Sequence, residues 1–436
     1  MIISNVPSGY EYASDSDQKY KVSAYVTGFK LLTGAIAKSD LEKFAEPGFL
    51  NKEGEFIRSS FGPNWMNCML VASQFQDCLP RIIRILTIPL PFQAGNKLVY
   101  PSEGYDPRFL TYLMPSAPRL IYPLPSLRNA IGILERTLLG FCFTSNQSRV
   151  HARARLITPF ARGILGWTTR VPLWFYCANR PRAGKDYLAA TNTILYEGHA
   201  HEDAPIGRDS SETGKRLVAA LLAGRRFMHF SNCKGHMRDE NLFAIVTNPK
   251  FRHRLLGSNA AAADLELANE LELSLSANHG FTADDDFLPR TRPIELGFFD
   301  EDPNARVFPD KFLHEHVLRD RSLILSALAT ILNYWAAQGF PRCDTPFTSF
   351  AKWGAIVGGI MQCCGLGNPC EPFKGTFDIG HDPECEAVRA LWQESAKEFK
   401  FPREAEKTEI YSLVDSSETG ALEWFGQMHD LAPKAP

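Results

Sequence analysis

A glycine–lysine pair near the middle of the chain, Gly184 and Lys185, has the surroundings of a phosphate-binding loop. Residues 173–177 before it are apolar and typical of a strand, and the residues after it suit a helix. In such a loop, backbone N–H groups and the helix N-terminus face a polyphosphate, and the lysine adds a positive charge for the outer phosphates. The predicted nucleotide-binding residues are Asn179, Arg180, Pro181, Arg182, Ala183, Gly184, Lys185, Asp186 and Tyr187.

This loop departs from the common pattern G-x-x-x-x-G-K-[ST] at two positions. Asn179 replaces the first glycine, which is a mild change because Asn tolerates the left-handed conformation better than most residues. Asp186 replaces the hydroxyl residue, and so places a carboxylate where a neutral oxygen normally reaches Mg²⁺. Two unit charges about 5 Å apart at an effective dielectric of ~20 interact by roughly 3 kcal/mol, which favours the metal and opposes bare phosphate. We therefore expect nucleotide binding to depend strongly on Mg²⁺.

A second predicted strand follows at residues 225–232 and ends in Ser231 and Asn232. In P-loop ATPases an acid at this strand end holds Mg²⁺, but here the two residues are a hydroxyl and an amide. Together with Asp186 they are the candidate metal ligands. The closest acid is Glu212, at the start of an amphipathic helix that could carry it into the site.

A third predicted strand, residues 272–278, ends in Asn278. Arg290 and Arg292 come after it and alternate into another strand. Taken alone, an Asn at a strand end is usually a turn residue, and two alternating arginines are usually a solvated strand face. The order is more informative: phosphate loop, strand with a polar end, strand ending in Asn and then arginines is the order found in ring-forming ATPases.

The composition limits the possible functions. A chain of 436 residues is long enough for two or three domains, and 44% hydrophobic with 22% charged residues is ordinary for a soluble globular protein. The net charge of −2 gives no general attraction to nucleic acid, so DNA contacts would need local basic groups. No signal pattern and no run as long as a membrane span is present, so we expect a cytoplasmic protein without a membrane partner. The candidate DNA-binding residues, which an exposed basic loop would explain equally well, are Arg225, Arg226, Lys234 and Arg238.

The C-terminal third has helical periodicity and a late group of cysteines. Residues 311–338 are predicted as a strongly helical segment, and residues 350–365 as an apolar helix in which Gly358 and Gly359 mark a close packing point. Residues 382–400 read as an amphipathic helix, followed by either a small winged-helix-like unit or a packing tail. A zinc site is conceivable, although the spacing fits no standard template. Its ligands would come from Cys363, Cys364, Cys370, His381 and Cys385.

From residue 104 to residue 369 the chain resembles the C-terminal ATPase module of primase-helicases from phages, plasmids and other mobile elements. Those are AAA+-type proteins related to the superfamily-three and minichromosome-maintenance-like helicases. An ordered series of motifs carries the resemblance: 104–107 (GYDP), 156–160 (LITPF), 179–185 (NRPRAGK), 212–216 (ETGKR), 254–258 (RLLGS), 276–278 (SAN), Arg290, 303–308 (PNARVF), Arg321 and 347–353 (FTSFAKW).

The resemblance implies an α/β fold with an AAA+-like P-loop NTPase core at residues 146–305. A mixed α/β N-terminal domain, residues 1–145, would bind DNA or mediate oligomerisation, because it lacks any recognisable acidic triad for primer synthesis. Residues 306–370 would form a helical lid, and residues 371–436 a helical or winged-helix-like tail.

The same resemblance implies an ATP-dependent DNA helicase or translocase that serves the replication of a mobile element. Subunits would form a ring, with a hexamer as the expected form, and hydrolyse ATP with Mg²⁺ at their interfaces. Lys185 would bind the phosphates, Asn278 would position the attacking water, and Arg290, with Arg292 as a second candidate, would reach a neighbour's γ-phosphate. The partners would be single-stranded or forked DNA, further copies of the chain, and a separate primase or loader.

One alternative stays open at this point: a degenerate P-loop protein that binds nucleotide or DNA without turnover, as a scaffold for replication initiation or assembly. The changes at Asn179 and Asp186, and the missing acid of the second strand, favour it. The joint presence of Lys185, Glu212, Asn278 and Arg290 argues against it, because a dead site has no need of all four.

Overall fold

The computed structural model describes the chain between residues 8 and 373 of 436. Within these limits it leaves out residues 14–18, 25–33, 43–46, 61, 78, 122–123, 125, 201–202, 205, 207–209, 255–263, 279–280, 285, 300–307 and 345–346. The predicted tail, residues 371–436, therefore lies almost entirely outside the described residues. The same holds for His381 and Cys385 of the suggested zinc site. Among the described residues there is no group of three His, Cys, Asp or Glu side chains that could hold a metal ion.

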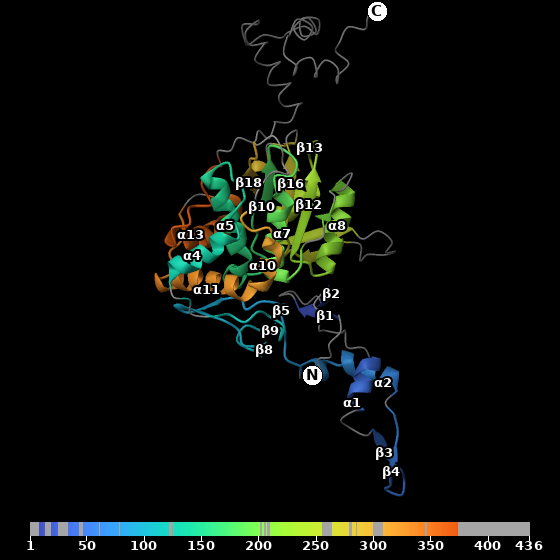
Figure 1. The fold of residues 1–436 in the computed structure, drawn as a ribbon. Helices are drawn as coiled ribbons and strands as arrows, with labels where there is room; N and C mark the ends of the chain where they lie inside the picture. Colours follow the sequence, from blue (N-terminus) through green and yellow to red (C-terminus); the bar gives the residue numbers. More distant parts are fainter. Residues whose placement is uncertain are drawn as a thin grey trace, which may run out of the picture.

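A sheet of five parallel strands forms the centre of the molecule (Figure 1). Apart from the two-residue β11, the strands are largely buried, as expected inside a parallel sheet, and β10 reads as a continuous apolar run. The predicted α/β class with strands at 173–177, 225–232 and 272–278 is confirmed. In their order across the sheet the strands are β11 (Asp203–Ala204), β12 (Phe227–Cys233), β16 (Glu272–Asn278), β10 (Leu173–Ala178) and β18 (Thr291–Leu296).

Two helices that pack against each other, α5 (Asn146–Phe160) and α7 (Lys185–Glu197), lie on one face of the sheet (Figure 1). α5 contacts β18, whereas α7 contacts β10, β12 and β16. α8 (Ser210–Leu222) lies at the far edge beside α9 (Glu240–Thr247). The smaller elements around them are α4 (Leu127–Arg136), α6 (Arg162–Leu165), β13 (His236–Met237), β17 (Thr282–Ala283), and the antiparallel pair β14 (Lys250–Arg254) and β15 (Asp264–Ala268).

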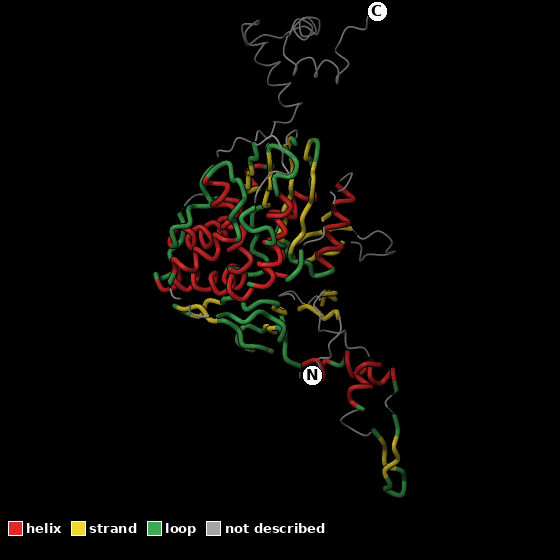
Figure 2. Tube along the Cα trace, in the orientation of Figure 1, coloured by secondary structure: helices red, strands yellow, loops and turns green. Residues whose placement is uncertain are grey.

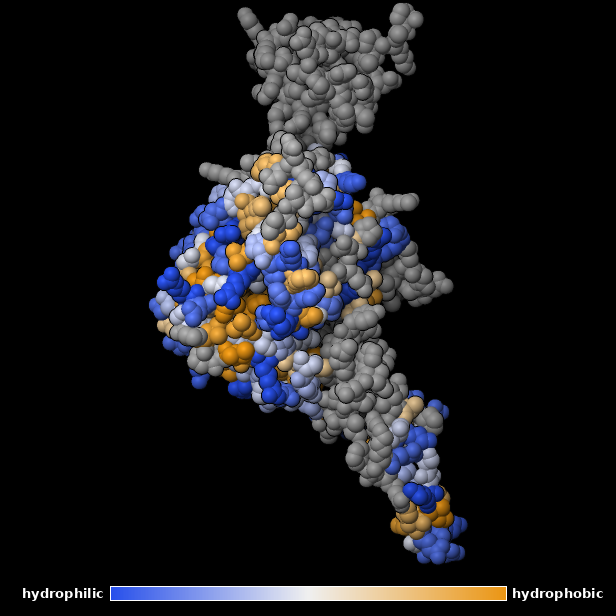
Figure 3. Space-filling view, in the orientation of Figure 1, coloured by the Kyte–Doolittle hydropathy of each residue, from blue (hydrophilic) through white to orange (hydrophobic). Residues whose placement is uncertain are grey.

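The N-terminal part consists of short elements that extend below the central sheet into an arm (Figure 2). At the tip of the arm the hairpin β3–β4 exposes Phe49, Leu50, Phe56 and Ile57, which form an apolar patch in the space-filling view (Figure 3). The predicted domain boundary at residue 145 stays a prediction. The elements are β1 (Ser8–Ala13), β2 (Lys19–Ala24), α1 (Gly34–Leu41), β3 (Gly48–Leu50), β4 (Phe56–Arg58), α2 (Pro63–Val71), α3 (Ser73–Asp77), β5 (Arg84–Leu86), β6 (Phe92–Ala94), β7 (Lys97–Val99), β8 (Gly104–Asp106) and β9 (Thr111–Leu113).

The helices after the sheet differ in one respect from the sequence expectation. The helix predicted over residues 311–338 is interrupted at Asp320, whose φ of −96° and ψ of 16° separate α10 (Leu313–Arg319) from α11 (Arg321–Ala337). A π-helical turn, 354–358, lies between α12 (Ala351–Trp353) and α13 (Gly359–Cys363). A Cβ on Gly359 would lie 2.2 Å from the Pro341 carbonyl oxygen, so the predicted close packing point is confirmed. Among the described helices, none is long and apolar enough to cross a membrane.

Candidate functional site

The loop between β10 and α7 turns the chain at the carboxyl edge of the sheet. Gly184 precedes the helix with a φ of +92°, a left-handed conformation that favours glycine, so α7 begins at Lys185. The left-handed residues of the loop are Arg182 and Gly184. Asn179 has a different role from the expected one: its Nδ2 donates to the Phe298 carbonyl at 2.9 Å, and its Oδ1 accepts from the Phe298 N–H at 3.0 Å. These two bonds attach the start of the loop to the chain just after β18.

Lys185 and Asn278, which the sequence placed in one site, are in contact. Lys185 is only 4% exposed, and its Nζ donates to Asn278 Oδ1 at 2.5 Å. The contact follows from the sheet, because Ala178 at the end of β10 pairs with Asn278 at the end of β16. Burial lowers the pKa of Lys185, and the neighbouring Asp186 charge opposes this effect. Because Lys185 is the first residue of α7, its ammonium group lies beside the helix N-terminus, a position suited to binding phosphate.

Asp186 is held by two side chains from neighbouring strands. Its Oδ1 accepts from Ser276 Oγ at 2.5 Å and lies 3.1 Å from Nε2 of His229. Burial raises the pKa of Asp186, but the hydrogen bonds from His229 and Ser276 and the nearby charge of Lys185 outweigh this effect and lower the pKa to about 2. The carboxylate is therefore ionised at neutral pH, and 37% of the side chain faces solvent.

A row of polar side chains along β16 explains how this cluster is assembled. In Glu272-Leu-Ser274-Leu-Ser276-Ala-Asn278 every second residue is polar, and alternate residues of a strand share one face. Each polar side chain bonds a different partner, with Ser274 Oγ 2.8 Å from Nδ1 of His229. Sequence reasoning missed His229, Ser274 and Ser276 as site residues. The available signal was the alternation itself, since strands buried on both faces normally lack it.

The end of β12 is a bulge beside this cluster. The β12–β16 register shifts between Phe230 and Cys233, so Ser231 and Asn232 stand outside regular pairing. Asn232 has a φ of +52°, and its backbone N–H donates to Ser276 Oγ at 3.0 Å. Since Ser276 also donates to Asp186, a chain of hydrogen bonds joins the bulge to the carboxylate. The three candidate metal ligands thus belong to one neighbourhood.

The chemistry of these groups fits Mg²⁺. Mg²⁺ takes oxygen ligands and usually binds proteins through one or two carboxylates, completing its shell with waters and substrate phosphates. Asp186 supplies one ionised carboxylate, and Ser231 and Asn232, in the bulge that Ser276 links to it, carry further oxygen atoms of the kind that Mg²⁺ binds. Such a set would hold the cation weakly without a polyphosphate and more tightly with one.

Tyr187 connects the start of α7 to α10. Its ring stacks on His314 with a centroid distance of 3.6 Å and an interplanar angle of 15°. Nε2 of His314 lies 2.8 Å from the Tyr187 carbonyl oxygen, and burial lowers the pKa of His314. The predicted lid segment therefore contacts the loop helix directly.

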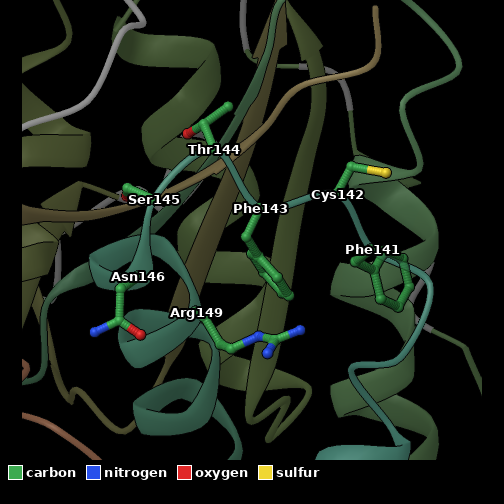
Figure 4. Close-up of a pocket in the computed structure, with 7 residues that line it drawn as sticks. All are labelled: Phe141, Cys142, Phe143, Thr144, Ser145, Asn146 and Arg149. Carbon is green, nitrogen blue, oxygen red and sulfur yellow. The ribbon is translucent and has the colours of Figure 1, made fainter. Parts of the chain in front are cut away.

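A cavity of about 350 Å³ lies around the segment that precedes α5 (Figure 4). The Phe141 ring in its wall is 6.4 Å from the Tyr187 ring. The Gly297 N–H donates to the Cys142 carbonyl at 2.8 Å, which places this wall beside the end of β18 that Asn179 holds. The cavity is lined by Phe141, Cys142, Phe143, Thr144, Ser145, Asn146 and Arg149.

The predicted arginines lie at the opposite, amino edge of the sheet. Thr291 pairs with Leu173, the first residue of β10, so about five residues or ~17 Å of strand separate this edge from the phosphate loop. Arg290 pairs with Asp286 at 2.6 Å and lies 5.2 Å from the Phe243 ring centroid.

The assignment of Arg292 to a subunit interface is corrected by its burial. It is 8% exposed, its guanidinium lies 3.6 Å from the centroid of Phe347, and burial lowers its pKa to about 10. Every residue of β18 is buried, so Arg292 lies in the core of its own subunit, where its guanidinium packs on aromatic rings.

Glu212 lies in the first turn of α8, where it bonds Lys215 Nζ at 2.6 Å in the same helix. α8 packs against α9, β14 and β15, at the border of the sheet. The structure thus gives Glu212 a partner one turn away in its own helix.

The four basic residues proposed for DNA form two groups rather than one. Arg225 and Arg226 precede β12 at the amino edge, and Arg226 Nη2 donates to the Ile85 carbonyl at 3.0 Å. Lys234 and Arg238 follow β12 at the carboxyl edge, and both are exposed. The seven residues of β12, about 20 Å of strand, separate the groups.

No family model and no curated protein matches this sequence. Among solved structures, the apo C-terminal region of NrS-1 is similar at 10% identity and a TM-score of 0.36, over 86% of this chain and 78% of that one. The active helicase Cch of SCCmec type IV is similar at 11% identity and a TM-score of 0.34, over 91% and 73%. The JCV helicase is similar at 14% identity and a TM-score of 0.26, over 55% and 66%. Similarity at this level says nothing about what this chain binds or does. The α/β fold class is assigned from the chain's own parallel sheet.

Proposed function

We propose that this chain is an ATP-hydrolysing motor of the helicase type, which moves along DNA as a ring of identical subunits. One observation carries the proposal: Lys185 lies at the N-terminus of α7, in contact with Asn278 from the adjacent strand and next to the ionised Asp186. A buried cation, a helix N-terminus and a carboxylate suited to Mg²⁺ at one sheet edge together match a nucleoside triphosphate. The resemblance to mobile-element primase-helicases suggests that the motor serves replication.

Each side chain of the cluster has a separate task in hydrolysis. Lys185 neutralises charge that develops on the transferred phosphoryl group. Asn278 accepts from Lys185 through Oδ1, so its Nδ2 protons are the ones directed to water or phosphate. Mg²⁺ at Asp186 would add charge neutralisation on the phosphate oxygens. The cavity around Phe141 is within the usual size range of ligand sites, and its Phe141 ring lies 6.4 Å from the ring of Tyr187 at the start of α7.

Arg290 acts on a neighbouring subunit in this proposal. It lies at the amino edge, remote from the phosphate loop of its own chain, so it can meet a γ-phosphate only if another copy presents one. This requirement favours a closed ring over a monomer. The hexamer, and a separate primase or loader, are the forms that the resemblance implies.

The test is steady-state ATP hydrolysis with Mg²⁺, with and without single-stranded DNA, for wild type, Lys185→Ala and Arg290→Ala. We expect DNA-stimulated turnover in wild type and its loss in both variants. Mixing the two inactive variants should restore part of the activity, because some interfaces then combine an intact Lys185 with an intact Arg290. Turnover in Lys185→Ala equal to wild type would contradict the proposal.

A second candidate function is a nucleotide- or DNA-binding scaffold without turnover. It is favoured by the bulge at the end of β12, where Ser231 and Asn232 stand in place of the usual acid. In that case wild type would bind ATP with Mg²⁺, Lys185→Ala would abolish the binding, and neither would hydrolyse ATP.

A further inference from the structure

One histidine of the cluster has no task in the function proposed above. His229 lies in the middle of β12, is 1% exposed, and has a partner at each ring nitrogen. Nε2 lies 3.1 Å from Asp186 Oδ1, and Nδ1 lies 2.8 Å from Ser274 Oγ. The imidazole thus bridges the central strand and the first turn of α7. Buried histidines normally have hydrogen-bond partners, but here one of the partners is the carboxylate of Asp186.

The partners determine which nitrogen carries the proton. The Asp186 carboxylate is ionised and can only accept, so Nε2 of His229 is the donor. Nδ1 faces the Ser274 hydroxyl, which can either donate or accept, so Ser274 fixes the orientation of the ring that bonds Asp186.

We propose that His229, oriented by Ser274, is a positioning residue that holds the Asp186 carboxylate in place to receive Mg²⁺. This inference rests on the proposed function. Asp186 Oδ1 accepts from both His229 and Ser276, which fixes the plane of the carboxylate and leaves Oδ2 as the oxygen for the cation. The usual strand-end acid is replaced by Ser231, and β12 contributes to the metal position through this imidazole instead. Loss of such a partner of a ligating group typically lowers metal affinity 10- to 100-fold.

The experiment measures Mg²⁺ linkage in the full chain. Binding of a fluorescent ATP analogue is titrated with Mg²⁺ and repeated in EDTA, and binding of Mn²⁺ alone is followed by electron paramagnetic resonance. The variants are His229→Leu, His229→Gln, which keeps an N–H donor near the position of Nε2, and Ser274→Ala. His151→Leu is the matched control, since His151 is also fully buried but bonds the Pro293 carbonyl oxygen.

In His229→Leu, we expect the Mg²⁺ concentration for half-maximal nucleotide binding to rise about 10- to 100-fold. Mn²⁺ binding should weaken in parallel, while nucleotide affinity in EDTA stays close to wild type. His229→Gln should recover most of the loss, Ser274→Ala should lose less than His229→Leu, and His151→Leu should leave the Mg²⁺ midpoint unchanged.

A merely structural histidine would weaken binding equally with and without Mg²⁺, and that result overturns the inference. The inference also falls if folded His229→Leu matches His151→Leu. Should His229→Leu fail to fold, an unshifted Mg²⁺ midpoint in Ser274→Ala overturns the inference. If wild type binds no nucleotide at any Mg²⁺ concentration, the proposed function falls as well, so the wild-type titration separates the two failures.

Discussion

Both ends of β16 carry polar residues, but the charged groups around the two ends differ in their access to solvent. At the amino end, Glu272 is buried between Arg155 and Arg162, with contacts of 2.6 and 2.7 Å. At the carboxyl end, Ser276 and Asn278 bond Asp186 and Lys185, and Asp186 remains partly open to solvent. The first set of charges is enclosed by protein, whereas in the second set the Asp186 carboxylate is held in place but accessible. Polar residues on a buried strand therefore indicate function only where their partners reach solvent.

The strongest test of this difference is Glu272→Ala. Removal of one carboxylate leaves two buried guanidinium groups without their shared partner, which typically costs about 3–5 kcal/mol. Urea unfolding should show a loss of this size. The control is Glu212→Ala, which breaks a half-exposed ion pair with Lys215 and should cost less than about 1 kcal/mol. Equal losses in the two variants would refute the distinction between the ends.

Acid should destabilise the chain through the buried His151. Burial and the nearby Arg292 charge lower the pKa of His151 to about 3, against about 6.5 when unfolded. The unfolded chain thus binds a proton that the folded chain excludes, so stability falls as the pH drops from 6.5 towards 3, by up to about 1.4 kcal/mol per pH unit.

The measurement is the free energy of unfolding at pH 7 and at pH 5 for wild type and His151→Gln. The decrease between these pH values should be larger in wild type by about 2 kcal/mol, because Gln at this position does not titrate. Parallel decreases would mean that His151 is not held neutral by its surroundings.

At the carboxyl end of β16, Asp186→Asn should separate binding from stability. The change keeps the shape of the side chain, and solvent screens the lost charge because 37% of the side chain is exposed. We therefore expect a stability change below about 1 kcal/mol. Mg²⁺-dependent nucleotide binding should nevertheless weaken at least tenfold. Differential scanning fluorimetry and nucleotide titration on the same preparation give both numbers. A melting temperature that falls as far as in Glu272→Ala would mean that both ends are structural.

The smallest effect concerns the basic residues at the two edges. If DNA passes over the carboxyl edge, Lys234→Ala should reduce the slope of log affinity against log salt by roughly 1, as expected for one lost phosphate contact. Arg225→Ala, at the amino edge, is the matched control and should leave the slope unchanged. The reverse result would place DNA at the amino edge instead.

The sequence predicted the fold class and the central pair of the site, because both depend on local patterns. Apolar runs marked β10 and β12, and Gly-Lys marked the start of α7. Asn278 was found because it ends a strand. The partners of Asp186 were missed, since His229 and Ser276 are 43 and 90 residues away in the chain and meet it only through strand order.

Errors arose where the direction of a side chain decides its role. Arg292 lies where the sequence placed it, on a strand after the third one, but both faces of this strand are covered and the guanidinium packs on Phe347. Arg290, two residues earlier, precedes the strand and stays partly exposed. A break at Asp320 within a strongly apolar helical pattern was likewise missed, because periodicity continues across it.

In the proposed ring, the attachment of Asn179 to Phe298 would make β18 a mechanical link between two subunits. One end of this strand is clamped to the phosphate loop of its own chain, and the other end carries Arg290. Six residues of extended chain behave as a rod of about 20 Å. Any shift of the loop on filling or emptying must therefore tilt the rod or break two hydrogen bonds, at a net cost of about 1–3 kcal/mol. The order in which the subunits of such a ring hydrolyse ATP would then depend on the stiffness of one strand.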